Sequence, residues 1–237
     1  MCSVSVIIPC YKDEVKLAYL LKKLHQLPHY PTEIIVVDGA GSKKCREICN
    51  QYRVIWLSSE PCRGKQLLAG AALAQGDVLW FLHADARLPT DPLPAMTAAF
   101  EQDAVGGYFC FRFDAPRTWT TRVLEFAIAL RCHFGGVPYG DQGLFLSRQI
   151  YFQVGGHAPW PLFEEVPLVR GARCAGKFLP LSEPIFVDSG RWQRDGWWRR
   201  TWNNRKLALG FACGITPHDL ASLYQSGNLS KTTKTYL

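Results

Sequence analysis

The first hundred residues alternate short apolar runs, rich in β-branched side chains, with longer amphipathic stretches. The apolar runs predict strands over residues 4–8, 33–37, 54–57 and 77–82. The amphipathic stretches predict helices over residues 13–24, 43–52, 65–74 and 91–102. This alternation predicts an α/β fold, in which a mostly parallel sheet carries helices on both faces.

Polar loops follow the predicted strands: "PCYKDE", "DGAGSK" and "HADARLP". In parallel sheets, ligands bind outside the carboxyl ends of the strands. We therefore expect five ionisable side chains to converge on one edge of the sheet: Asp13, Glu14, Asp38, His83 and Asp85.

The pattern changes after residue 106. The run "GGYFCFRFD" predicts an exposed or mixed-sheet strand, "TWTTRVLEFAIALRCHF" an amphipathic helix, and "GGVPYGDQGLFLS" a glycine-rich loop that enters a strand. A segment dense in Trp and Arg, "GRWQRDGWWRRTWNNRK", precedes a short helix over residues 217–224. We expect one domain and a frayed, polar C-terminal end.

Composition limits the environment and the partners. The chain has 237 residues, and its nine cysteines include no CxxC pair, so we expect free thiols, a reducing compartment and a cytoplasmic protein. The N-terminus shows no secretion signal, and no apolar run reaches the roughly 20 residues that span a bilayer. The net charge of +7 favours an anionic partner.

Two nucleotide-binding classes are excluded because their glycine-rich loops are missing from the sequence. A dinucleotide-binding fold needs GxGxxG after its first strand, where this chain has "PCYKDE". The chain also lacks the GxxxxGK[ST] loop of nucleotide-hydrolysing enzymes. Strand-end acids around the basic segment "CRGKQ" instead suit a nucleotide diphosphate.

Several motifs together carry a resemblance to a known family: "VVDG", "FLHAD", "PYGDQGLF", an acidic pair before a helix, and "RWQR". In this order they resemble the family-2 glycosyltransferases of GT-A fold, specifically a small bacterial subgroup, over about residues 3–224. The resemblance implies a nucleotide-sugar-binding half (1–104), an acceptor and catalytic half (105–190) and C-terminal Trp/Arg-rich helices (191–225).

The resemblance implies a donor site on the first loops, where Pro9, Tyr11, Asp13 and Glu14 hold the nucleoside and Asp38 takes the base edge. A carboxylate can accept the imide N–H of uracil, which favours a UDP-sugar. The alternative for Asp38 is a helix N-cap, and for Asp13 and Glu14 it is a helix-dipole contact.

The resemblance also implies a divalent metal, Mn²⁺ or Mg²⁺, at "HAD". Asp85 is the expected ligand, His83 a second candidate, and Ala84 lies between them in the donor site. Mn²⁺ accepts imidazole more readily than Mg²⁺ does. The alternatives are a histidine bonded to backbone and an aspartate that caps the following turn.

Two further loops are candidates for the diphosphate and the sugar. Arg63 and Lys65 could neutralise the diphosphate, with Gly64 letting backbone amides approach; the alternative is a solvated turn. Asp141 and Gln142, polar groups held between glycines, are expected to face the sugar or the acceptor.

The resemblance implies that the second acid of the pair Glu164 and Glu165 deprotonates the acceptor in an inverting transfer. We name Glu165 as the general base, with Asp141 in reserve. The family usually has Asp there, so the longer Glu165 is a departure, as are Lys43 and Leu68. The alternative for the pair is a favourable interaction with the helix dipole.

The Trp/Arg segment has two interpretations. In one, its helix rests on anionic lipid and receives a lipid-linked acceptor, while Arg191 and Trp192 resemble the family's late Arg-Trp motif that closes on donor phosphates. In the other, the tryptophans complete the core and the arginines are solvated. No nucleic-acid module is visible, so we expect no nucleic-acid partner.

The sequence thus predicts a metal-dependent, inverting glycosyltransferase that uses a nucleotide sugar, with an acceptor that is lipid-linked or a carbohydrate. Two rivals stay open: a degenerate relative that only binds nucleotide or membrane, and a nucleotidyltransferase. The latter needs a glycine-rich, Arg-containing loop after its first strand, which "PCYKDE" does not provide.

Overall fold

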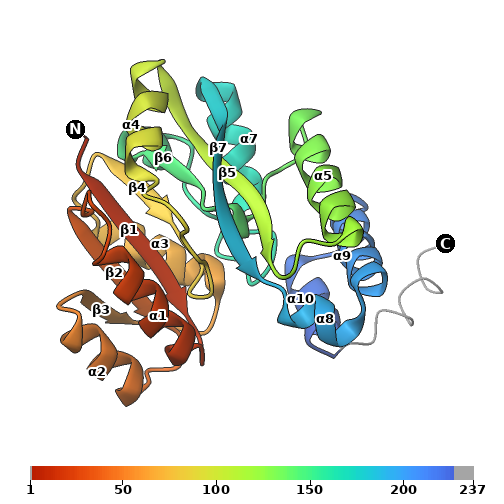
Figure 1. Ribbon diagram of the computed structural model, residues 1–237, viewed down its shortest axis with the longest axis horizontal. Helices are drawn as coiled ribbons and strands as arrows, with labels where there is room; N and C mark the ends of the chain where they lie inside the picture. The colour runs from red at the N-terminus through yellow and green to blue at the C-terminus, as the bar shows by residue number, and fades with distance from the viewer. Residues whose placement is uncertain (1, 227–237) are drawn as a thin grey trace.

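All seven strands form one sheet in the computed structural model of the chain, which describes residues 2–226 (Figure 1). The strand order is β3-β2-β1-β4-β6-β5-β7. The C-terminal end that the sequence predicts to fray lies outside the described residues. The strands are β1 (Val4–Cys10), β2 (Glu33–Asp38), β3 (Ile55–Ser58), β4 (Val78–Phe81), β5 (Ala104–Asp114), β6 (Phe145–Ser147) and β7 (Lys177–Asp188).

Helices alternate with the strands and then close the chain. They are α1 (Glu14–Leu24), α2 (Lys43–Gln51), α3 (Arg63–Leu73), α4 (Leu93–Glu101), α5 (Trp119–His133), the 3₁₀ turn η1 (Gly140–Gln142), α6 (Arg148–Gln153), α7 (Glu165–Ala175), α8 (Gly190–Asp195), α9 (Trp197–Ala212) and α10 (Pro217–Ser226). The four strands and four helices predicted for the first hundred residues are all present. The predicted α/β class is confirmed.

The first four strands are parallel, and their side chains alternate between two apolar layers. In β1, Val6 and Ile8 face the layer that holds the buried leucines of α1, whereas Ile7 faces the layer that holds Leu67 of α3. Because both faces are covered, these strands read as continuous apolar runs. Burial of each such side chain contributes about 1.5–3 kcal/mol.

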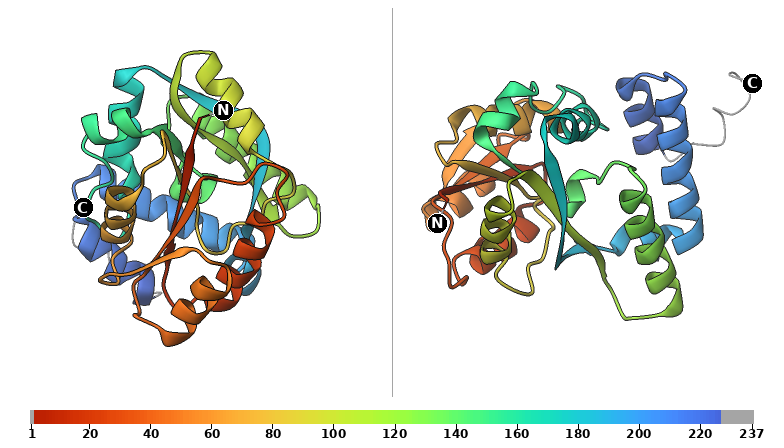
Figure 2. Two further views of the ribbon diagram at one scale, coloured as in Figure 1. Left: turned by 90° about the vertical axis from the view of Figure 1, so that its left-hand side faces the viewer. Right: turned by 90° about the horizontal axis from the view of Figure 1, so that it is seen from above.

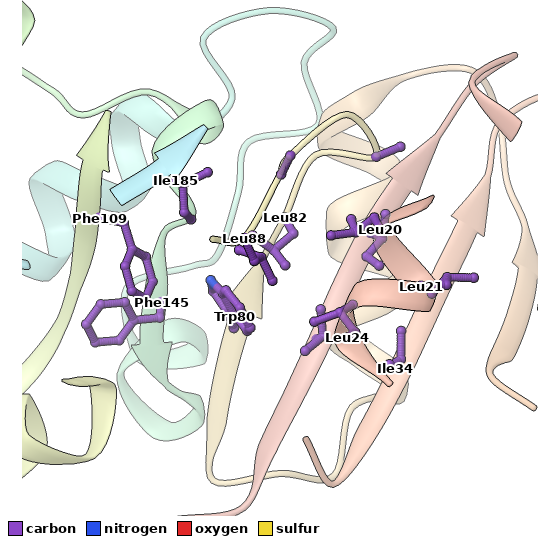
Figure 3. Close-up of a cluster of buried hydrophobic side chains, with 14 of the residues drawn as sticks. Leu20, Leu21, Leu24, Ile34, Trp80, Leu82, Leu88, Phe109, Phe145 and Ile185 are labelled. Atoms are coloured by element: carbon purple, nitrogen blue, oxygen red, sulfur yellow. The ribbon is translucent and has the colours of Figure 1, made fainter. Parts of the chain in front are cut away.

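Aromatic residues fill the larger of these layers where the two halves of the sheet meet (Figure 3). The ring of Trp80 from β4 lies 5.7 Å from that of Phe109 in β5, which lies 5.6 Å from Phe145 in β6. All three side chains are fully buried. The packing joins the residues of both halves into one core.

The second half of the sheet is mixed, as the alternating run before residue 114 predicts. Strand β6 is antiparallel to both β4 and β5, and β5 is parallel to β7. The sequence pattern does not predict strand β7, because Pro180 and Pro184 interrupt its alternation. Proline removes a ladder donor and is confined to edge strands, and β7 is the last strand of the sheet.

The C-terminal helices pack against the start of α7. Leu207 of α9 and Leu220 of α10 are buried with Phe163 and Val166. The ring of Phe211 stacks on that of Phe163 at 4.8 Å. Figure 2 shows α9 and α10 at the end of the molecule opposite α2 and β3. These helices therefore cover the segment that carries the acidic pair.

Two expectations from composition can be compared with the structure. All nine cysteines are free thiols, as expected, with Cys10, Cys45 and Cys49 buried. Within residues 2–226, no helix combines the length and the apolar character needed to cross a bilayer.

Candidate active site

Six ionisable side chains from separate loops and helix ends lie close enough to influence one another's pKa. We call them the charge cluster: Arg63, His83, Asp141, His157, Glu164 and Glu165. His83 follows β4, so the cluster lies at the carboxyl end of a parallel strand, where the fold class places ligands.

The acidic pair is anchored by Arg63, the first residue of α3. The guanidinium donates from Nε to Oε1 of Glu164 and from Nη2 to Oε2, the latter at 2.9 Å. Burial opposes the charge of Glu164, but the charge and hydrogen bonds of Arg63 keep the pKa of this carboxyl below its ordinary value. Arg63 is thus held by a buried carboxylate, and the diphosphate contact that the sequence predicts for it stays a prediction.

Gly64 lets the start of α3 approach the segment before the acidic pair. Its N–H donates to the carbonyl of Trp160 at 3.0 Å, and a Cβ here would lie 2.0 Å from the carbonyl oxygen of Ala158. The close approach that we expected toward phosphate is made toward protein backbone instead. It brings Arg63 within reach of Glu164.

Glu165, the predicted general base, is the first residue of α7 and is 2% exposed. Its Oε2 has no hydrogen-bond partner. Burial, followed by the charge of Glu164, raises the pKa of Glu165 to about 8. Glu165 is therefore mostly protonated at pH 7 and a strong base once ionised.

The loop "PYGDQGLF" brings a third acid to the cluster. Burial raises the pKa of Asp141 to about 6, against the opposing charges of Arg131 and Arg63. A Cβ on Gly140 would lie 2.9 Å from Nε2 of His83, so the glycine allows the loop to pass directly over the imidazole.

Gln142, in contrast, is buried for packing reasons. Its amide nitrogen donates to the carbonyl of Phe109 at 3.4 Å, and its oxygen accepts from the thiol of Cys132. Only 2% of the residue is exposed. We expected Gln142 to face sugar or acceptor, and the structure directs it into the protein because β5 and α5 supply its partners.

The residues of "HAD" supply two kinds of group that bind divalent metals, an imidazole nitrogen and a carboxylate. Nε2 of His83 is buried without a partner, and burial together with the charge of Arg63 lowers the pKa of His83 to about 4, which leaves the imidazole neutral. The carboxylate of Asp85 makes no hydrogen bond or ion pair within residues 2–226, and Ala84 is buried between them. Within residues 2–226, the side chain of His83 is not bonded to backbone and that of Asp85 does not cap the following turn.

The metal set is small. No group of three or more His, Cys, Asp or Glu side chains is arranged for a metal in the part of the chain that the structure describes. Mg²⁺ and its analogues are commonly held by one or two protein groups plus substrate phosphates. His83 and Asp85 suit such a site.

Lys16 is a site residue that sequence reasoning missed. Its Nζ donates to Asp188 at 2.7 Å and lies 3.6 Å from Asp13, which joins α1 to the end of β7. Lys16, Asp85 and Asp188 line a cavity of about 150 Å³. The signal was its place on α1 one turn after Asp13.

His157 and Arg131 were also missed. Nδ1 of His157 lies 3.1 Å from the hydroxyl of Tyr151, and burial lowers the pKa of His157 to about 4. Arg131 lies over the ring of Tyr139 at 4.1 Å. Nothing in the sequence around His157 distinguishes it, because the fold alone brings it to the cluster.

Asp38 has a local role. Its carboxylate accepts from the amides of Ala40 at 2.8 Å and Ser42 at 2.6 Å, and it is fully buried. The N-cap of α2 is Ser42, which accepts from the amide of Cys45. Asp38 therefore shapes the β2–α2 loop and does not cap α2, and its contact with the base stays a prediction.

The remaining nucleoside candidates surround the end of β1. Pro9 is buried in the strand, whereas Tyr11 is exposed beside Lys12, whose φ of 58° turns the chain toward α1. Asp13 occupies the N-cap position of α1 without a side-chain cap bond. Glu14 has its pKa lowered by its own backbone amide and by Ser42, which links the first two loops.

Three other candidates divide between cluster and periphery. Arg191 donates to the hydroxyl of Tyr224 at 2.6 Å, and its charge contributes to the lowered pKa of His83. Trp192 packs on Phe113 at 5.1 Å, which serves the core. Lys65 forms an exposed ion pair with Glu60.

Comparison with known proteins gives one family match. Residues 5–159 match the sequence profile described as Glycosyl transferase family 2. An undecaprenyl-phosphate 4-deoxy-4-formamido-L-arabinose transferase from Pseudomonas syringae pv. syringae (strain B728a) is 27% identical over 158 residues, which cover 60% of this chain and 46% of that protein. The chain thus spans about half the length of the curated relatives it matches.

Solved structures show a similar fold. A mannosyltransferase from Pyrobaculum calidifontis, in complex with GDP-Man and Mn²⁺, aligns with a TM-score of 0.66 at 16% identity, covering 88% of this chain and 62% of that one. Glucosyl-3-phosphoglycerate synthase from Mycobacterium tuberculosis, in complex with Mn²⁺, UDP and glucosyl-3-phosphoglycerate, aligns with a TM-score of 0.59 at 16% identity, covering 77% and 70%.

Proposed function

This chain belongs to glycosyl transferase family 2, and on that premise we propose that it transfers a sugar from a nucleotide-sugar donor to an acceptor hydroxyl. One observation carries the proposal. Glu165 has an unpartnered carboxyl oxygen in a buried cluster, beside a Glu164 that Arg63 keeps ionised. Paired carboxyl groups with opposite pKa shifts are typical of acid–base sites.

In the proposed reaction, ionised Glu165 takes the proton of the acceptor hydroxyl as its oxygen attacks the anomeric carbon. The bond from that carbon to the diphosphate oxygen breaks on the opposite side, so the anomeric configuration inverts. Asp141, with a pKa near 6, is the second candidate for the base. The positive charge of Arg191 lies near His83, and in the proposal it stabilises the departing diphosphate.

The proposal includes a divalent metal, Mn²⁺ or Mg²⁺, held by Asp85 and His83. When bound, such an ion neutralises charge on the departing diphosphate. The support is the unpartnered Nε2 of His83 and the place of Asp85 in the lining of the cavity beside Lys16. Two of the similar solved structures contain Mn²⁺, which agrees with this assignment.

The raised pKa of Glu165 favours a hydroxyl over a phosphate as the acceptor. A phosphate monoester, whose second pKa is about 6, is ionised at neutral pH and needs no base. A hydroxyl must lose its proton during attack. The curated relatives are named for undecaprenyl phosphate, so we propose that this chain differs from them in the acceptor group.

A UDP-linked donor stays part of the proposal, although both carboxylate oxygens of Asp38 already accept from amides of its own loop. Two of the departures from the family pattern lie outside the charge cluster. The side chain of Lys43 is 91% exposed and 3.8 Å from Glu47, and Leu68 is a half-buried residue of α3. The position of these two departures outside the charge cluster weakens the case for a degenerate relative.

Calorimetric titration of UDP and GDP, with and without Mn²⁺, tests the donor site. We expect Mn²⁺-dependent binding by the wild type that Asp85→Asn abolishes. Asp103→Asn is the matched control, because Asp103 is a surface residue with a positive φ that Asn tolerates. Equal binding by all three proteins would show that Asp85 does not hold the metal. Stronger binding of GDP than of UDP would show that the donor is linked to GDP and not to UDP.

Hydrolysis of the donor without an acceptor separates a catalyst from a binder. Water can replace the acceptor hydroxyl, so a catalyst releases free sugar slowly and a degenerate binder releases none. Release of sugar with retained configuration would contradict the inverting mechanism.

A further inference from the structure

Helix α5 presents an apolar stripe to solvent. Trp119, Phe126 and Phe134, the last just beyond its C-terminus, are 67%, 66% and 77% exposed, and Val123 and Leu130 between them are also exposed. The spacing of three or four residues places them on one side of the helix. The opposite side carries the buried anchors of the helix, including Leu124.

Helix α9 has a second stripe. Trp198, Trp202 and Leu209 are exposed, at spacings of four and seven residues, whereas Leu207 is buried against α10 and the segment before α7. Trp192 and Trp197, in contrast, pack on Phe113. The Trp/Arg segment thus divides between the core and the surface. Trp192 and Trp197 complete the core, and Trp198 and Trp202 are the pair available for contact with lipid.

The two stripes meet at the first turns of their helices. The ring of Trp119 lies 5.9 Å from that of Trp198. Helices α5 and α9 lie side by side in Figures 1 and 2, at the end of the molecule away from α2. We call the exposed residues of both stripes the α5–α9 face.

The charge around this face is positive. Helices α5 and α9 carry six Arg and Lys residues, of which Arg122, Arg199 and Arg205 are exposed. Their only acid is Glu125, which is 2% exposed and bonded to Arg117 at 2.6 Å. The face therefore presents no carboxylate of these helices to an anionic partner.

An apolar cavity of about 380 Å³ borders the stripe of α5. Phe126 and Leu130 of the stripe line it together with Phe111 and Leu181 from the neighbouring strands. The apolar surface thus continues inward between α5 and the sheet.

We propose that the α5–α9 face binds the surface of an anionic phospholipid bilayer. Trp favours the membrane interface, Phe and Leu enter the boundary of the acyl chains, and arginines attract anionic headgroups. A second copy on this face would oppose arginine to arginine. A single-stranded nucleic acid would stack on the tryptophans but leave Val123, Leu130 and Leu209 in water.

Vesicle flotation of the full chain tests the proposal, using phosphatidylcholine vesicles with and without phosphatidylglycerol. We expect binding to the anionic vesicles, weakened by salt. The triple variant Trp119→Ser, Phe126→Ser, Trp202→Ser should bind at least about tenfold more weakly, because insertion scales with buried apolar area. Phe152→Ser, an exposed aromatic on α6, should bind like wild type.

A second variant keeps the test conclusive even if the triple variant fails to fold. Arg199→Glu with Arg205→Glu should remove the preference for phosphatidylglycerol and leave the melting temperature unchanged. Absence of binding to anionic vesicles, or equal loss in Phe152→Ser, would overturn the proposal. A dimer seen by light scattering would also overturn the proposal if the triple variant abolishes it. Binding of a single-stranded oligonucleotide that the triple variant abolishes would overturn it as well. None of these results depends on donor binding.

Discussion

At the scale of single residues, two adjacent glutamates have opposite electrostatic environments. Glu164 accepts two hydrogen bonds from Arg63, and Glu165 has an oxygen with no partner. Burial raises the pKa of both, but the arginine reverses the effect for Glu164 only. The pair therefore supplies one fixed negative charge and one proton-accepting group.

The first prediction is a pH profile. Because Glu165 has a pKa near 8, its ionised fraction, and with it kcat/KM for donor hydrolysis, should rise with pH through about 8. Stopped assays from pH 6 to pH 9 check this, over a range where Mn²⁺ stays in solution.

Glu165→Gln is the matched variant for that profile. It should lower the rate by about 10²–10⁴-fold, the usual contribution of a general base, and leave UDP affinity within a factor of about two. A Gln variant that keeps the wild-type rate and pH midpoint would transfer the role of base to Asp141.

The second prediction concerns the anchor of the pair. Arg63→Ala leaves Glu164 as a buried, unpaired charge, which should lower the free energy of unfolding by about 3–5 kcal/mol. Urea denaturation at pH 7 measures it. The double variant Arg63→Ala, Glu164→Ala should lose clearly less than the sum of the single variants. Additive losses would show that the contact contributes nothing.

At the scale of elements, the site depends on how closely α3 approaches the segment before α7. Gly64 N–H bonds to Trp160, and no side chain separates the two backbones. A helix start and a loop almost a hundred residues apart thus set the distance between Arg63 and Glu164. In the sequence this glycine looked like a phosphate contact because its protein partner is so remote.

The third prediction tests that contact. Gly64→Ala places a Cβ 2.0 Å from the carbonyl oxygen of Ala158, so backbone must shift at a cost of about 1–3 kcal/mol. Donor hydrolysis should fall because the acidic pair moves. Gly210→Ala, in α9, is the control: its nearest neighbours are side-chain tips of Leu220 and Ile215, and it should change stability little.

At the scale of the whole molecule, the C-terminal helices keep the acidic pair away from water. Leu207 of α9 packs with Phe163 and Val166, the residues on either side of Glu164 and Glu165. The same helix carries the exposed tryptophans of the α5–α9 face on another side. Contact with a bilayer would therefore lie on an element that also covers the site.

The fourth prediction follows from this cover. Leu207→Ala should let water reach Glu165 and move the pH midpoint of donor hydrolysis below that of wild type, toward the ordinary glutamate pKa. Leu209→Ala, on the exposed side of the same helix, should keep the wild-type midpoint. Equal midpoints in all three proteins would show that α9 does not control the pKa of Glu165.

The strands and helices of the first half can be predicted from local sequence, because a period of two or of 3.6 residues is a local property. The resemblance carried by short, contiguous motifs also predicts chemical roles for His83, Asp85 and Glu165, and these roles stay predictions. The edge strand β7 escaped prediction because its prolines break the pattern, and its place depends on β5.

Which polar groups face the site depends on tertiary packing. It bonded Arg63 to Glu164, turned Gln142 into the core, used Asp38 for its own loop and brought in His157. Asp38 bonds within its own loop, but the contacts of Arg63 and Gln142 depend on partners far away in sequence. Burial, which raises the pKa of Glu165, exists only once α3, α7 and α9 have packed together. Local patterns carry no information on such partners, so packing decided the electrostatics of the site.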